Sequence, residues 1–176
     1  MAGFKEVSAK RSSTRAYTAE KLTKEELDSI LAAGLQAPSA TNRQEIRFSV
    51  LDGSDPVIEE LEQEKMRLRN AARGEHNAFY EAPTVIFLSA EDDFRWSKVD
   101  AGIAVQSMSL AAEDLGLGSL IVGSVYDAMR GEKREYFKEK MRIPADREFQ
   151  IALAVGHKAA EKEPHTYDTD KQVVIV

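Results

Sequence analysis

Two short polar stretches hold the side chains that could bind an anion or a heterocycle. The first is Arg11-Ser-Ser-Thr-Arg15, in which arginines at both ends flank three hydroxyl side chains. Guanidinium and hydroxyl groups placed this closely can surround a phosphate. Basic turns rich in Ser and Thr are also common on protein surfaces, so this stretch taken alone is weak evidence for a phosphate site.

The second stretch is the loop Pro38-Ser-Ala-Thr-Asn-Arg-Gln44, which separates a predicted helix from an alternating strand at 46–50. Its Asn and Gln amides offer both donors and acceptors, as the edge of a heterocycle requires. Taken alone, an ordinary loop whose Ser and Asn bind nearby backbone groups is the better explanation.

A third stretch is rich in glycine and runs from Asp100 to Ser124. A dinucleotide-binding glycine loop follows a strand and opens a helix, whereas these glycines end a helix and open a strand. We therefore reject a Rossmann fold. Gly116 is expected to cap the helix, and Gly123-Ser124 could present backbone amides to a ligand.

No side chain in the sequence suggests hydrolysis or metal chemistry. The chain has no cysteine, and its three histidines lack the spacing of metal ligands. The adjacent acids Asp92-Asp93 and Glu113-Asp114 are expected to be solvated. We therefore predict no metal and no catalytic side chain, and expect a bound cofactor to carry the chemistry if the protein is an enzyme.

The bulk composition favours a single soluble domain over residues 1–176. The net charge of −6 is spread over interleaved acids and bases, which argues against nucleic acid as a partner. The N-terminus lacks the apolar run of a secretory signal, and the longest apolar run, near 85–88, is too short to span a membrane. We expect a cytoplasmic protein without a membrane partner.

Hydrophobic periodicity and capping signals predict about five helices and five strands. Thr23 and Glu26 form a capping box before a helix at about 24–36, and Asp55-Pro56 opens another that runs to about 73. The other helices are predicted at 3–10, 98–115 and 132–141, and the strands at 46–50, 84–90, 119–122, 149–155 and 172–176. The order lacks strict alternation, so α+β fits better than a doubly wound α/β fold.

Two of these elements predict contact between subunits. The helix at 98–115 carries many Ala and Gly residues, which allow another helix to approach closely. The tail at 172–176 is β-prone, and a lone terminal strand needs a sheet edge, which a partner subunit could supply.

In their order and spacing, these stretches resemble the FMN-dependent nitroreductase family. The residues that carry the resemblance are Lys10–Tyr17, Leu27–Asn42, Asp100–Ser119 and Ala152–Gly156, so it covers nearly the whole chain. It implies a nitroreductase-like fold, with a central mixed, mostly antiparallel sheet flanked by helices, in an intertwined homodimer that binds FMN at each end of the interface.

The resemblance also implies a role for particular residues. The flavin phosphate or ribityl chain would be bound by Arg11, Ser12 and Ser13, and Arg15 would lie at the N1/C2-carbonyl edge of the ring. The backbone of Val122, Gly123 and Ser124 would face the N5 side. The other subunit would contribute Pro38, Ser39, Ala40, Asn42 and Gln44.

The implied activity is NAD(P)H-dependent reduction of nitroaromatics or quinones, with ping-pong hydride transfer through flavin N5. Two alternatives stay open: a flavin-binding protein with little turnover, and a reductive dehalogenase or flavin-fragmenting relative. The last needs a lid, for which the connections at 75–79 and 92–96 leave little room.

The C-terminal region departs from the family pattern, because residues 163–170 are acidic where Lys or Arg usually reaches the phosphate. Lys158, His165 or a mid-chain base such as Arg69 or Arg73 could substitute. Trp96 could stack on a substrate or fill the interface.

Overall fold

The computed structural model describes residues 3–164 and 166–175. Its elements are α1 (Phe4–Lys10), α2 (Lys24–Leu35), the 3-10 turn η1 (Ala40–Asn42), β1 (Arg47–Asp52), α3 (Pro56–Arg69), β2 (Thr84–Ala90), α4 (Ser97–Asp114), β3 (Gly118–Val122), α5 (Tyr126–Arg130), α6 (Arg134–Lys140), β4 (Glu148–Gly156) and α7 (Thr169–Gln172). None of the helices in this part of the chain has both the length and the apolar character that a bilayer crossing requires.

The four strands form one sheet in the order β1-β2-β4-β3, and each neighbouring pair is antiparallel. The predicted α+β class is confirmed. The strand ladders are more uniformly antiparallel than the mixed sheet that we expected, since the parallel pairing in the described residues is the isolated bridge Ser13–Ser119.

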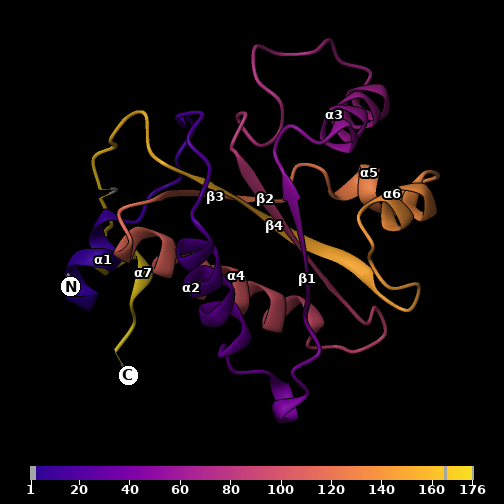
Figure 1. Ribbon diagram of the computed structural model, residues 1–176. Helices are drawn as coiled ribbons and strands as arrows, with labels where there is room; N and C mark the ends of the chain where they lie inside the picture. The colour runs from indigo at the N-terminus through magenta and orange to yellow at the C-terminus, as the bar shows by residue number, and fades with distance from the viewer. Residues whose placement is uncertain (1–2, 165, 176) are drawn as a thin grey trace.

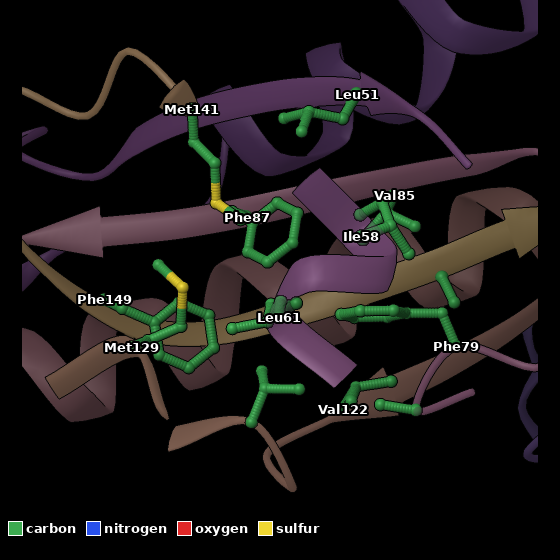
Figure 2. Packing of buried hydrophobic residues seen from close by; sticks show 14 of the residues in the cluster. Leu51, Ile58, Leu61, Phe79, Val85, Phe87, Val122, Met129, Met141 and Phe149 are labelled. Carbon is green, nitrogen blue, oxygen red and sulfur yellow. The ribbon is translucent and has the colours of Figure 1, made fainter. Parts of the chain in front are cut away.

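Helices cover both faces of the sheet, as Figure 1 shows: α3, α5 and α6 lie on one face, and α2 and α4 on the other. Because successive strand residues point to opposite faces, β2 sends Phe87 into the first layer and Ile86 into the second. Figure 2 shows Phe87 in the first layer with Leu61 of α3 and Met129 of α5. The two apolar cores thus lie on either side of a fully buried strand.

Local signals set several boundaries as the sequence predicted. The capping box of α2 is present: the Thr23 hydroxyl accepts from the Glu26 amide at 3.2 Å, and the Glu26 carboxylate accepts from the Thr23 amide at 2.8 Å. Gly116 has a φ of 77° and closes α4, with the Leu117 amide donating to the Ala112 carbonyl at 2.8 Å.

Other boundaries differ from the prediction. Helix α3 ends at Arg69 and not near residue 73, because Asn70 adopts a left-handed conformation with a φ of 48°. Helix α5 was not predicted, since its five residues are too few to show a helical period.

The predicted strand at 172–176 is wrong for the single chain. Gln172 ends helix α7, which the Asp168 side chain caps by accepting from the Asp170 amide at 3.2 Å. Val173–Ile175 follow as an exposed coil, and Val176 lies outside the described residues. Val173–Ile175 pair with no strand in the described part of the chain, and their apolar side chains are exposed.

The segment at 11–18 is fixed to the sheet beside β3, the edge strand. The Thr14 amide donates to the Ser119 carbonyl at 2.9 Å, and the Thr18 amide donates to the His157 carbonyl at 2.9 Å. The Thr14 side chain is buried in the space that Gly118 leaves, where a Cβ atom would lie 2.6 Å from its Cγ2 atom. Glycine at 118 therefore decides how closely this segment approaches.

We expect Gly118→Ala to destabilise the protein, because the new methyl group would push Thr14 away from β3. Overpacking of this kind costs about 1–3 kcal/mol in free energy of unfolding, which denaturant titration measures. Gly74→Ala is the control, because its Cβ would meet no heavy atom closer than the His76 carbonyl oxygen at 3.9 Å. Equal stability of the two variants would contradict this packing argument.

Candidate functional site

A pocket of about 220 Å³ lies where the 11–18 segment meets the chain that leaves β4. We call it the Ser13 pocket; it is lined by Ser12, Ser13, Thr14, Arg15, Ala16, Lys158, Ala160, Glu161 and Lys162. Hydroxyl groups and three cations therefore converge on one small cavity, as a phosphate site requires. Arg11 lies just outside this lining, where its amide closes α1 by donating to the Val7 carbonyl at 2.9 Å.

Arg15 is exposed, and the contacts that its guanidinium makes are long. Its guanidinium lies 5.8 Å from the centre of the Tyr80 ring and 3.5 Å from the Ser13 carbonyl oxygen. Below it, the Tyr17 hydroxyl donates to the Thr14 carbonyl at 3.0 Å, and burial raises the pKa of this phenol. Tyr17 is therefore a neutral anchor for the turn, while Arg15 is free to bind a ligand.

The other end of β3 presents backbone groups. Ile121 lies two residues beyond Ser119, so its amide and carbonyl face the same outer edge of the sheet. The strand then ends at Val122, whose side chain is buried in the core, and leads into Gly123 and Ser124. At Gly123 a Cβ would meet only Ile151 within 4 Å, at 3.4 Å, so little protein crowds this backbone.

The 38–44 loop is held by a buried carboxylate on α4. Both oxygens of Asp100 lie 3.1 Å from the Ala40 amide, and Asp100 is only 3% exposed. The Ser39 hydroxyl accepts from the Gln44 amide at 2.9 Å, so Ser39 satisfies local backbone, as the simpler interpretation of this loop predicts. Asn42 and Gln44 have positive φ angles, and their side chains are exposed.

A single chain does not bring the two groups of predicted residues together. The Ser13 pocket and the pocket beside the 38–44 loop share no lining residue. Figure 1 shows η1 at the foot of the molecule, far from the segment that follows α1. If both groups bind one ligand, two chains must therefore contribute to each site.

The structure separates the candidates for a substitute phosphate cation. Lys158 lines the Ser13 pocket, whereas Arg73 pairs with Glu59 at 2.8 Å and Arg69 donates to the Ser124 carbonyl at 3.0 Å. His165 lies outside the described residues.

The expectation that Glu113 is solvated is wrong. Its carboxylate lies 2.9 Å from the Lys158 ammonium, and its side chain is 7% exposed, because the end of β4 brings Lys158 against the last turn of α4. Asp92 also has a partner, since Arg130 donates to both of its oxygens at 2.7 and 2.8 Å.

Sequence reasoning missed three residues near these pockets: Asp100, Tyr80 and Lys162. Asp100 gave a usable signal, because an acid in a helix of small and apolar residues needs a partner when it is buried. Tyr80 gave none, since only the fold brings it near Arg15. Lys162 lies four residues after Lys158, but nothing in the sequence places either lysine beside Ser13. Trp96 is 41% exposed, with the Arg95 guanidinium 4.5 Å from its ring, and neither role suggested for it follows from this placement.

The model of the nitroreductase family matches residues 9–157, so this chain belongs to the nitroreductase family. The match includes the 11–18 segment, the 38–44 loop, α4 and the whole sheet.

Known proteins agree with this assignment. The chain is 28% identical over 169 residues to "FMN reductase [NAD(P)H]" of Bacillus subtilis, covering 84% of this chain and 62% of that protein's length. A nitroreductase of Desulfitobacterium hafniense, solved with bound FMN, is 28% identical and superposes with a TM-score of 0.88 over the whole of both chains. A nitroreductase from Bacteroides fragilis has the same fold, with a TM-score of 0.89 at 23% identity over the whole of both chains.

We expect Asp100→Ala to loosen the 38–44 loop, because the Ala40 amide would lose its buried, charged acceptor. The lost bond should cost about 1–3 kcal/mol in free energy of unfolding and speed trypsin cleavage after the exposed Arg43. Asp114→Ala is the matched control, an exposed acid on the same helix. Equal rates of cleavage in the two variants would show that Asp100 does not hold this loop.

Proposed function

We propose that this chain is an FMN-dependent NAD(P)H oxidoreductase that reduces nitroaromatics, quinones or similar small acceptors. The observation that carries the proposal is the Ser13 pocket, which gathers hydroxyls and cations beside the open edge of β3. The FMN bound in the solved D. hafniense relative and the name of the B. subtilis relative support it. Since the chain spans 62% of that curated relative, the activity of the whole relative is transferred only as a proposal.

The donors present fit the parts of FMN. Ser12 and Ser13 supply hydroxyls for the phosphate, with Arg11 beside them and Lys158 and Lys162 on the opposite wall. Arg15 is exposed and positively charged, which suits the edge of a ring that gains negative charge on reduction. At the end of β3, little protein crowds the backbone of Gly123. The Gly123 carbonyl accepts from the Tyr126 amide and the Ser124 carbonyl from Arg69, each at 3.0 Å, so we propose that the amides of this turn face the ring.

FMN would supply the redox chemistry by accepting hydride from NAD(P)H and passing electrons to the acceptor. The protein's own task is then to bind and orient the flavin and to stabilise charge at its edge. We therefore assign no side chain as a nucleophile or proton donor. NAD(P)H and the acceptor would use one open face in turn, which gives ping-pong kinetics, and the supply of NAD(P)H fits a cytoplasmic location.

We further propose that two copies of this chain form a homodimer that completes each site. The residues that would reach the flavin of the other subunit are Pro38, Ser39, Ala40, Asn42 and Gln44. The pocket beside their loop shares no lining residue with the Ser13 pocket of the same chain. Helix α4 leaves an apolar face uncovered, with Val99 49% and Ile103 37% exposed beside Gly102. This face and the exposed tail at 173–175 are surfaces that a second copy would cover.

The test of the proposed function is direct. The purified chain, supplied with FMN, should show the visible absorbance of bound flavin and should oxidise NAD(P)H faster when a nitroaromatic or quinone is added. A second candidate is a flavin-binding protein with little turnover, which the engagement of Lys158 by Glu113 favours. Flavin absorbance without acceptor-dependent oxidation of NAD(P)H would select this second function.

We expect Arg15→Ala to lower the reduction potential of the bound flavin, because a cation beside the ring stabilises the negative charge that reduction adds. One charge-assisted contact corresponds to about 2 kcal/mol in the reduced state, which potentiometric titration resolves. Arg11→Ala is the matched control from the same segment, because it removes an equal charge outside the lining of the Ser13 pocket and should leave the potential as it was. Equal potentials in Arg15→Ala and the parent would exclude this role for Arg15.

We expect the chain to be a dimer at micromolar concentration and Gly102→Glu to break it. A Cβ at Gly102 meets no atom within 4 Å in the single chain, so the substitution spares the monomer fold and places a charge on the α4 face. Light scattering should show loss of the dimer together with loss of bound flavin, whereas Gly74→Glu in an exposed loop should change neither. A wild-type monomer that retains flavin would refute the dimer.

A further inference from the structure

One wall of the Ser13 pocket contains a cation that is already paired. The Lys158 ammonium lies 2.9 Å from Glu113 and 3.5 Å from Glu161. Its side chain is 12% exposed and that of Glu113 is 7% exposed, whereas Glu161 is largely in solvent at 83%. The buried partner of Lys158 is therefore Glu113.

Lys158 stands between two cavities. It lines the Ser13 pocket and also a larger pocket of about 550 Å³, whose lining includes Glu113, Lys10 and Gly116. Its stem packs beside Gly118, where a Cβ atom would lie 2.9 Å from the Lys158 Cγ atom. The stem is thus fixed in the shared wall, while the ammonium is drawn toward Glu113 at the end of α4.

The position of Glu113 strengthens this attraction. Glu113 lies in the last turn of α4, where the partial negative charge of the helix end opposes a carboxylate. A carboxylate that is also shielded from water needs a cation, and removal of one partner from such a pair leaves an unpaired charge that is costly to bury. The cost of leaving Glu113 unpaired therefore favours the state in which Lys158 stays in the ion pair.

We propose that Glu113 competes with the phosphate of FMN for Lys158, so that this chain holds FMN weakly, hardly prefers it to riboflavin, and exchanges it with free flavin. The inference rests on the proposed function and assigns a specificity role to Glu113. A phosphate monoester carries about −1.5 to −2 charges at neutral pH. In the Ser13 pocket it would have to share Lys158 with the buried Glu113 and would be repelled by that carboxylate, while the exposed Glu161 adds a second, more strongly solvated negative charge.

Titration of the full chain, freed of flavin, tests this through the quenching of flavin fluorescence. In the wild type, the dissociation constants of FMN and riboflavin should agree within about threefold, because the buried lysine of the pocket is occupied by Glu113. Glu113→Gln should tighten FMN binding about tenfold, as expected when one charge-assisted contact becomes available. Riboflavin lacks the phosphate, so its affinity should not change.

Asp114→Asn is the matched control, because it removes an equal charge from the adjacent, exposed position and should alter neither affinity. Lys158→Arg covers the case in which Glu113→Gln fails to fold. It keeps the buried pair but adds donors, so that one guanidinium can bind carboxylate and phosphate together. It should tighten FMN binding severalfold without an effect on riboflavin.

The outcomes distinguish the role of Glu113 from the proposed function of the chain. If riboflavin and FMN both bind but Glu113→Gln and Lys158→Arg alter the two affinities equally, or alter neither, the role of Glu113 is overturned while the proposed function stands. If FMN binds the wild type far more tightly than riboflavin, the competition is likewise excluded. If neither flavin binds the wild type, the proposed function is wrong, and this inference with it.

Discussion

The attachment of the 11–18 segment to the edge of β3 is the contact on which the candidate site depends. One backbone hydrogen bond from Thr14 to Ser119 sets the register, and the missing side chain at Gly118 lets Thr14 pack into the strand. Ser12, Ser13 and Arg15 then face a cavity together with residues that follow β4. Without this attachment, the arginines and hydroxyls would be an ordinary polar surface.

Buried carboxylates fix the positions of three loops in the molecule. Asp100, Glu62 and Glu45 are each less than 5% exposed. Each accepts a hydrogen bond from a backbone amide in a loop: Ala40 at 3.1 Å, Ala78 at 2.9 Å and Glu91 at 3.3 Å respectively. A buried charge is costly unless it is paired, so each loop amide is bound strongly and its loop has one preferred position. Asp100 and Glu62 thus tie their loops to α4 and α3, and Glu45 ties the residues before β1 to the end of β2.

Electrostatic balance shapes the site as much as its geometry does. The chain is acidic overall, and several of its cations are engaged by acids within the same chain: Lys158 by Glu113, Arg73 by Glu59, and Arg147 by Glu45. Arg15 is exposed near the aromatic ring of Tyr80. The Ser13 pocket is thus lined by a paired lysine and an exposed arginine. This contrast suits the proposal that the protein controls the charge on a ring more firmly than it binds a phosphate.

The sequence by itself determined the elements that local chemistry controls. The capping box at Thr23 and Glu26, the glycine cap at Gly116 and the apolar strand at 84–90 each involve neighbours within a few residues, so their patterns could be read directly. The motifs also singled out Ser12, Ser13 and Arg15, which line one cavity, and their role in binding a flavin stays a prediction.

Only the tertiary structure decided the pairings between residues distant in the chain. Nothing near Glu113 in the sequence indicates Lys158, and nothing near Ala40 indicates Asp100, because burial and partner are properties of packed elements. The tail at 172–175 shows the same limit. Its residues are β-prone, but a strand forms only where it pairs with a sheet edge, and in the single chain the fold leaves 173–175 unpaired after helix α7.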